Sequence, residues 1–480
     1  MTDFTDLVDL AAERLGGSVL TANDEFFAPK ENLLKAGEAV WIEGKYTEVG
    51  KWMDGWETRR RREPGHDWCI VRLGLPGALQ GVIVDTAYFR GNFPESCSIE
   101  ACAVEGYPTP EEVIAAEWVE VLPRSVLQGN AKNLFPIDHK AVRFTHLRFN
   151  IFPDGGVARL RVHGEVAADW SRLARHGEVD LAAVEHGGRV LACSDMFFGN
   201  RHNLILPGPP LGMHDGWETR RRRGPGHDWA IVKLGARGAI HRVEVDTSHF
   251  KGNAPGSCWI EGCDGEPAEG SESWREVLPR APLRPHTVHR FDEVAAAGPF
   301  THVRLNIHPD GGVARLRLFG TVSGIDRLNA LAPQESEAAL LACCGSRRWA
   351  RQVAESRLFR DISEIKEAAD RIWWSLGRED WLEAFAAHPR IGEKGSRRSE
   401  DEQAGARGAE EETLAALVAA NREYEARFNH IFIVCATGKS AGEMLDLLRE
   451  RLDNDPETEL RIAAEEQRKI THLRLEKLLS

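Results

Sequence analysis

Residues 54–68 read DGWETRRRREPGHDW, and residues 215–229 read DGWETRRRRGPGHDW. The two stretches differ at a single position, where Glu63 stands against Gly224. Near-identity over a segment of this length indicates that one folding unit is present twice. The internal repeat therefore decides the fold before any local pattern does.

The duplication extends through most of the first two thirds of the chain. Three further pairs of segments match: SVLTANDEFFAPKENLL (18–34) with RVLACSDMFFGNRHNLI (189–205), VDTAYFRGNFPESCSIEAC (84–102) with VDTSHFKGNAPGSCWIEGC (245–263), and THLRFNIFPDGGVARLRVHG (145–164) with THVRLNIHPDGGVARLRLFG (301–320). These matches predict two tandem domains, the first repeat at residues 1–166 and the second repeat at residues 167–323.

Each repeat carries the pattern of a β domain. Short runs such as GVIVDTAYF, CSIEAC and THLRFNIF are rich in Val, Ile and Phe, alternate in part, and are separated by Gly, Pro or Asn. Several short strands at such spacing are typical of a β-sandwich or a jelly roll.

The motifs DGWETRRRR, GHDW, VDT and PDGGVAR occur in both repeats, and together they resemble the allantoicases over residues 18–321. The resemblance implies two jelly-roll modules of the galactose-binding-like kind. It also implies hydrolysis of allantoate to ureidoglycolate and urea.

Allantoate is a small anion with two ureido arms, so a guanidinium can grip its carboxylate while carboxylates and amides hold the arms. Hydrolysis also needs a water activated by a general base or a metal. The candidate residues are Glu57, Arg59, Arg61, His66 and Asp67 in the first repeat and Glu218, Arg220, Arg222, His227 and Asp228 in the second.

The arginine runs 59–62 and 220–223 are expected on or beside a strand, where alternate side chains face opposite ways. For any one arginine, a solvated position or an ion pair with a nearby acid is the simpler interpretation. His66–Asp67 and His227–Asp228 could be a base with its orienting acid, or ligands, but adjacent strand residues point apart. No HxH or HExxH spacing indicates a metal site.

After about residue 324 the chain becomes rich in Ala, Glu, Arg and Leu. In RLFRDISEIKEAADRIWWSL (357–376), helical spacing places Leu358, Ile362, Ile365, Ala369 and Ile372 on one face. ELRIAAEEQRKITHLRLEKLL at the end of the chain predicts a second long helix. Residues 324–480 are therefore expected to be all-α, so the predicted architecture is two tandem β-sandwich domains followed by an all-α domain.

The stretch REDWLEAFAAHPRIGEKG (378–395) predicts a helix that runs to about Ala387. His388 would lie at its C-terminus, because the following Pro389 disfavours helical backbone. The negative end of the helix dipole favours an imidazolium there, so His388 could donate a proton near neutral pH. On spacing alone, a plain C-terminal cap is the simpler interpretation. Ser399 and Glu402 have the spacing of a capping box, which competes with a catalytic role for Glu402.

HPRIG, S-x-x-E-Q, NREYEARFNHIFIVCATGKS and RLDNDPETELRIAAEEQRKITHLRL resemble, in this order, the 2-oxo-4-hydroxy-4-carboxy-5-ureidoimidazoline (OHCU) decarboxylases of urate breakdown. The resemblance covers nearly all of residues 324–480 and implies an all-helical enzyme that needs no metal or organic cofactor. It implies that His388, the proton donor, and Glu402 are catalytic. The implied substrate-binding residues are Pro389, Ser399, Gln403, Phe432, Ile433, Val434 and Cys435. The family usually has FGFPF where this chain has FNHIF (428–432), so His430 could reshape one wall of the pocket.

Composition narrows the function classes. The net charge is −13, which excludes the basic footprint of a sequence-independent nucleic-acid binder. Apolar runs such as IFIVCA (431–436) are too short to span a bilayer. The first residues lack the apolar core of a secretory signal, and nine dispersed cysteines without a CxxC pattern fit a reducing cytoplasm.

The sequence thus predicts a bifunctional enzyme of purine catabolism that acts on small ureides, allantoate and OHCU, in the cytoplasm. No nucleic-acid or membrane partner is expected, and a homo-oligomer is compatible with the sequence. Two alternatives stay open for the β half: tandem non-catalytic binding modules, or one catalytic repeat beside a scaffold repeat.

Overall fold

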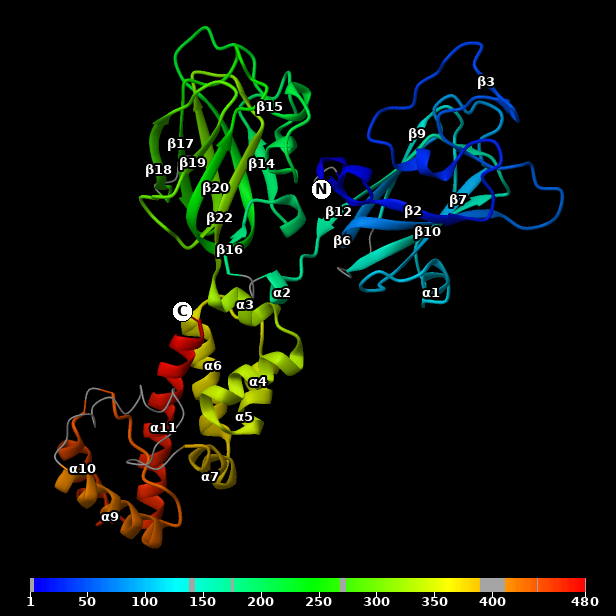
Figure 1. The fold of residues 1–480 in the computed structure, drawn as a ribbon. Helices are drawn as coiled ribbons and strands as arrows, with labels where there is room; N and C mark the ends of the chain where they lie inside the picture. Colours follow the sequence, from blue (N-terminus) through cyan, green and yellow to red (C-terminus); the bar gives the residue numbers. More distant parts are fainter. Residues whose placement is uncertain are drawn as a thin grey trace. The chain divides into compact units, whose positions relative to one another are not determined.

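The computed structural model describes residues 4–137, 143–173, 177–267, 273–388, 411–437 and 439–479. The chain divides into two compact units, one of Met1–Asp169 with His176–Thr321 and one of Trp170–Arg175 with Val322–Ser480. The first unit holds both β repeats, drawn from blue to green in Figure 1, and the second holds the long helices, drawn from yellow to red. The predicted order of two β domains and an all-α domain is confirmed, while the boundaries at residues 166 and 323 stay predictions.

Each repeat is built on an antiparallel eight-stranded sheet with the same topology. In the first repeat the order is β1-β12-β6-β10-β7-β8, and β2 and β9 also pair with β6. These strands are β1 Val8–Asp9, β2 Ser18–Ala22, β6 Asp67–Asp85, β7 Ser96–Cys102, β8 Val119–Val126, β9 Lys132–Pro136, β10 Phe144–Phe152 and β12 Arg159–Val166. Their counterparts are β13 Val179–Asp180, β14 Arg189–Cys193, β16 Asp228–Asp246, β17 Ser257–Cys263, β18 Arg275–Pro282, β19 Val288–Phe291, β20 Phe300–His308 and β22 Arg315–Val322.

The long central strand of each repeat changes partners halfway along. Residues 67–72 of β6 pair with β10, and residues 77–85 pair with β12. The change falls at LGLPG (73–77), where a Cβ on Gly77 would lie only 2.2 Å from the Glu165 carbonyl oxygen. Glycine is needed at this crossing because no side chain fits between the two backbones. One strand can therefore contribute to two groups of neighbours, as a sandwich requires.

The DGWE stretch is anchored in the core by its tryptophan. Trp56 and Trp217 are fully buried, and each indole N–H donates a 2.8 Å hydrogen bond to a backbone carbonyl, of Asp24 and Asp195 respectively. Each tryptophan and the glutamate after it form a short strand. The strand β5 (Trp56–Glu57) pairs with β11 (Gly156–Val157), and β15 (Trp217–Glu218) pairs with β21 (Gly312–Val313). The first role of the DGWE stretch is therefore structural.

The repeats differ in one connection. In the first repeat, residues 35–53 link the 3-10 helix η3 (Lys30–Leu34) to Asp54, and they include the hairpin of β3 (Tyr46–Thr47) and β4 (Gly50–Lys51). In the second repeat, residues 206–214 link η6 (Arg201–Ile205) to Asp215, which is ten residues fewer. We call residues 35–53 the insertion segment.

The second unit is helical, as Figure 1 shows. Its long helix α11 packs against α3, α4, α6 and α7 around a core that includes Trp349, Trp373 and Phe385. The helices are α2 Trp170–Leu173, α3 Gly324–Ala330, α4 Pro333–Cys344, α5 Arg347–Glu355, α6 Ile362–Ser375, α7 Arg378–Ala386, α9 Glu411–Phe428, α10 Ala441–Arg451 and α11 Pro456–Leu479. The short helix α1 Pro110–Ile114 belongs to the first β repeat. Among the helices that the structure describes, none has the length and apolar character needed to cross a bilayer.

One predicted helix begins later than its sequence pattern suggested. Asp361 caps α6 by accepting a hydrogen bond from the Glu364 backbone N–H, so Leu358 lies before the helix. Leu358 is 76% exposed and Ile362 is 40% exposed, so the prediction of one apolar helix face is wrong at these two positions. The later positions of the same face, Ile365, Ala369 and Ile372, are buried as predicted.

A buried ion pair ties three helices of this unit together. Glu459 of α11 is fully buried and accepts hydrogen bonds from Arg451 Nε at 2.8 Å, from Asn454 Nδ2 at 2.7 Å and from the Tyr424 hydroxyl. Burial raises the pKa of Tyr424, so its hydroxyl remains a donor. Arg451 also donates through Nη1 to the Ile433 carbonyl at 2.9 Å.

Replacing Glu459 with glutamine is expected to destabilise the helical unit by about 3–5 kcal/mol, because Arg451 then keeps a buried charge without its partner. The measurement is chemical denaturation of the full chain, followed by the far-ultraviolet circular dichroism of the helices. Glu457→Gln on the same helix is the control, since Glu457 is exposed and should change stability little. Equal stability of the two variants would contradict the assigned role.

Candidate active sites

The arginines of the opening stretch lie directly after β5 and β15, beside a strand rather than within it. Arg59 binds Asp24 twice, from its backbone N–H at 2.9 Å and from Nε at 2.6 Å, and its guanidinium covers the Phe26 ring. Arg220 makes the same contacts with Asp195 and Phe197. These two candidate residues therefore hold their own loop in place.

Arg61 and Arg222 join the same loop to more distant parts of each repeat. Arg61 Nη1 donates at 2.7 Å to Asp67, which is 1% exposed, and the Arg61 backbone N–H donates at 2.8 Å to Asp154 of the PDGG turn. Arg222 likewise contacts Asp228 through its side chain and Asp310 through its backbone. Both arginines are thus committed to structural ion pairs.

The other two arginines of each run point to solvent. Arg60, Arg62, Arg221 and Arg223 are exposed, and none of them makes a hydrogen bond or an ion pair with the part of the chain that the structure describes. Every second arginine of the run therefore pairs with a carboxylate and the others face solvent, which is the alternation that the sequence predicted for an extended backbone.

The two His-Asp dipeptides do not form internal pairs. Asp67 accepts hydrogen bonds from Arg61 and from Asn23 Nδ2 at 2.9 Å, while the His66 ring lies against Phe152 with centroids 4.7 Å apart. His227 contacts Asn306 Oδ1 at 3.2 Å through Nε2, while Asp228 pairs with Arg222. Within the described ranges, no three His, Cys, Asp or Glu side chains form a group suited to a metal ion.

Glu57 is a candidate residue that lines a cavity in the first repeat. The cavity has a volume of about 570 Å³, and the side chains that shape it include Trp41, Lys51, Glu57, Tyr88, Arg90 and Asn92. Glu57 is half-buried, and its Oε1 accepts a 2.7 Å hydrogen bond from Asn92 Nδ2. Burial raises the pKa of its carboxyl above the ordinary value, although the Asn92 hydrogen bond opposes that shift.

Sequence reasoning missed the other residues around Glu57. Arg90 and Asn92 lie in VDTAYFRGN (84–92), whose match to VDTSHFKGN was a usable signal for a shared site. Trp41 and Lys51 gave no such signal, because the insertion segment has no counterpart in the second repeat. In the second repeat, Glu218 keeps the same carboxamide partner and accepts a hydrogen bond from Asn253 Nδ2 at 2.5 Å.

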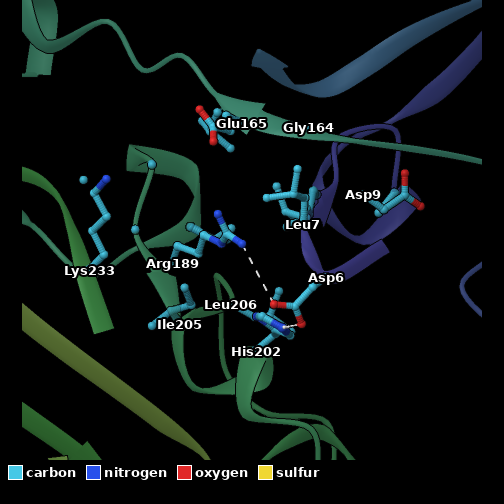
Figure 2. Close-up of a pocket in the computed structure, with 18 of the residues that line it drawn as sticks. Asp6, Leu7, Asp9, Gly164, Glu165, Arg189, His202, Ile205, Leu206 and Lys233 are labelled. Carbon is cyan, nitrogen blue, oxygen red and sulfur yellow. Dashed lines mark hydrogen bonds and ion pairs between the residues drawn. The ribbon is translucent and has the colours of Figure 1, made fainter. Parts of the chain in front are cut away.

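A second cavity of about 480 Å³ is lined by residues of both repeats, among them Asp6, Glu165, Arg189, His202 and Lys233 (Figure 2). Asp6 lies between His202 and Arg189 in this view. Its carboxylate binds Arg201 at 2.6 Å and His202 at 3.2 Å, and it lies 3.9 Å from Arg189. Asp6 therefore already occupies hydrogen-bonding positions of Arg201 and His202.

In the helical unit, His388 lies where the sequence predicted. Helix α7 ends at Ala386, and the His388 backbone N–H donates to the Phe385 carbonyl at 3.0 Å. Pro389, Ser399, Glu402 and Gln403 lie outside the described residues. His430 is buried against Phe385 and lines a cavity of about 280 Å³ beside the end of α7. Burial lowers the pKa of His430, which favours its neutral form.

The segment 431–436 is neither helix nor strand and is held through its backbone. Besides the Arg451 bond to Ile433, the Cys435 N–H donates to Glu466 Oε2 at 2.7 Å, and Lys439 Nζ donates to the Cys435 carbonyl at 2.7 Å. Phe432, Ile433 and Val434 are buried, and Cys435 is half-buried. The predicted substrate-binding segment is thus a fixed loop.

Comparisons with known proteins follow the same division of the chain. A family model described as the allantoicase repeat matches residues 8–167 and 179–323, and a model for OHCU decarboxylase matches residues 329–476. A probable allantoicase of Pseudomonas aeruginosa (strain UCBPP-PA14) is 52% identical over 326 residues, which cover 66% of this chain and 97% of that protein.

A solved structure agrees with the allantoicase match. The crystal structure of allantoicase from Saccharomyces cerevisiae is 38% identical with a TM-score of 0.55, over 65% of this chain and 92% of that chain. A crystal structure of OHCU decarboxylase in the presence of (S)-allantoin is 40% identical over 29% of this chain and 95% of that chain, with a TM-score of 0.27 against the whole chain. The chain belongs to the allantoicase family, and its two allantoicase repeats are followed by an OHCU decarboxylase domain.

Proposed function

We propose that this chain catalyses two reactions of urate breakdown. The β repeats hydrolyse allantoate to ureidoglycolate and urea, and the helical unit decarboxylates OHCU to (S)-allantoin. The observation that carries the first activity is Glu57, a half-buried carboxylate in a cavity that also contains Lys51 and Arg90. Dispersed free thiols at all nine cysteines support a cytoplasmic location.

In the proposed hydrolysis, Arg90 holds the carboxylate of allantoate and Glu57 acts as the general base. Glu57 takes a proton from a water whose oxygen bonds to the carbon that carries both ureido groups. The bond from that carbon to one ureido nitrogen breaks. The proton passes from Glu57 to the leaving nitrogen, so that urea and ureidoglycolate form.

In the proposed decarboxylation, the bond from the ring carbon to the carboxylate breaks and CO2 leaves. The electron pair is delocalised into a neighbouring carbonyl or imine of the substrate, and His388 delivers a proton to the same carbon. The fixed loop 432–435 orients the substrate, which is a large part of such catalysis. Pro389, Ser399, Glu402 and Gln403 complete the proposed site.

The experiment is to incubate the full chain with each substrate, and to measure urea release from allantoate and loss of OHCU. Both activities are expected. Binding of allantoate without urea release would instead favour the alternative of non-catalytic β modules attached to a decarboxylase.

As the pH is lowered, the rate of allantoate hydrolysis is expected to fall. The fall should occur at a higher pH than for a catalytic glutamate with the ordinary pKa of about 4.3. The ionised form of Glu57 is the base, and burial raises its pKa, so activity is present above that pKa and lost below it. Asn92→Ala should shift this loss of activity to a still higher pH, because the Asn92 hydrogen bond lowers the pKa of Glu57 in the wild type. A pH profile of kcat/KM that is identical for the two proteins would exclude Glu57 as the titrating group.

A further inference from the structure

The two repeats present the same carboxylate–carboxamide pair in different surroundings. Glu57 with Asn92 and Glu218 with Asn253 have matching hydrogen bonds at matching positions. In the first repeat, however, the insertion segment supplies Trp41, Glu43, Lys51 and Met53 to the cavity around Glu57. The shorter connection of the second repeat, residues 206–214, has no counterpart of these residues.

Backbone and side-chain contacts hold the insertion segment as a wall of the cavity. Its first part is fixed by Arg159, which is 3% exposed and donates to the Gly37 carbonyl at 2.9 Å. Asp54 accepts from the Val40 backbone N–H at 3.0 Å and pairs with Arg159 at 2.7 Å. The buried Arg159–Asp54 ion pair therefore holds residues 37–40 of the insertion segment against the core of the repeat.

Aromatic stacking fixes the other end of the wall. The Trp41 ring stacks on Tyr88 with centroids 6.0 Å apart and an interplanar angle of 27°. Lys51 Nζ lies 4.2 Å from the centroid of the Trp41 ring, and the Trp41 indole N–H donates to Glu43 at 2.8 Å. A flat apolar surface and a cation are thus placed side by side at the cavity, which suits a planar ureido group and a carboxylate.

A second cation that lines the cavity also differs between the repeats. Arg90 is exposed at the cavity and makes no hydrogen bond or ion pair with the described residues. Its counterpart is Lys251, which cannot make the bidentate contact of a guanidinium with a carboxylate. Tyr88 corresponds to His249, whose Nε2 is already bonded to the Pro210 carbonyl at 3.0 Å.

We infer that the first repeat alone binds allantoate for hydrolysis. Arg90 and Lys51 hold its carboxylate, Trp41 and Tyr88 pack against one ureido arm, and Glu57 faces the reacting carbon. The second repeat keeps the DGWE framework and the Glu218–Asn253 pair but serves as a scaffold. This inference rests on the proposed hydrolysis of allantoate.

The test uses the full chain, and substitutions at matched positions of the two repeats serve as controls for one another. Arg90→Gln is expected to raise KM for allantoate about 10- to 100-fold, the effect of losing a charge-assisted contact. Lys251→Gln, at the matched position of the second repeat, should leave KM and kcat unchanged. Trp41→Ala should also raise KM, and the thermal unfolding transition of the β unit, measured for each variant, serves as the check that this unit is folded.

Calorimetric titration of the Glu57→Gln chain with allantoate should give one site per chain, and adding Arg90→Gln should abolish it. Two equivalent sites, or equal losses from Arg90→Gln and Lys251→Gln, would overturn the inference while leaving the proposed hydrolysis intact. A wild-type chain that neither binds allantoate nor releases urea from it would overturn both.

Discussion

The Glu57→Gln chain is expected to hydrolyse allantoate about 10²- to 10⁴-fold more slowly than the wild type, because glutamine cannot accept the proton of the attacking water. The side chains have nearly the same shape, and Asn92 can still pair with the glutamine carbonyl, so the cavity and substrate binding should be kept. The measurement is kcat from urea release under saturating allantoate. The loss should appear in kcat with little change in KM.

Glu218→Gln is the matched comparison for this prediction. Glu218 has the strand position equivalent to that of Glu57, and its partner Asn253 is the equivalent of Asn92, so a similar disturbance of the fold is expected from the two substitutions. A loss of kcat confined to Glu57→Gln is the expected pattern. If Glu218→Gln alone abolished urea release, the catalytic carboxylate would belong to the second repeat.

His388→Ala is expected to slow OHCU decarboxylation by about 10²- to 10⁴-fold, because the carbanion left by CO2 then lacks a positioned proton donor. Allantoate hydrolysis should be unchanged, since Glu57 and His388 belong to different compact units. The measurement is the rate of OHCU loss, corrected for its uncatalysed decay, with urea release from allantoate recorded on the same sample.

His472→Gln provides the control for this variant. His472 also belongs to the helical unit, but its Nε2 is bonded to Asp370 at 2.6 Å, which gives it a structural partner. Its replacement should leave the decarboxylation rate near that of the wild type. An unchanged rate in a folded His388→Ala chain would remove His388 from the proposed mechanism.

Two of the four arginines that mark each repeat have a structural explanation. Arg59 and Arg61 connect their loop to Asp24 and Asp154, which lie 35 and 93 positions away in the sequence. Two other arginines that recur in both repeats have a related role: Arg159 and Arg315, in the GGVAR motif, are buried and donate to backbone carbonyls of the connection before DGWE. A motif can therefore recur within a chain because the fold needs it, while the substrate contacts lie elsewhere.

The sequence by itself determined the broad organisation of this protein. Near-identity of the two DGWETRRRR stretches established the duplication, alternation and turn residues indicated the β repeats, and helical spacing indicated the C-terminal unit. The position of His388 at a helix end also followed from sequence, because Pro389 restricts the backbone before it. These features depend on local backbone preferences, which a sequence displays directly.

The tertiary structure alone decided which side chains meet. It paired Arg59 with Asp24, 35 positions away, which local pattern does not reveal, and it selected Asp67 from the nearby acids as the partner of Arg61. It also gathered Glu57, Arg90 and Trp41 around one cavity. Trp41 lies in an insertion that the repeat comparison passes over, so only the folded backbone, held there by the buried Arg159–Asp54 pair, brings it to the site.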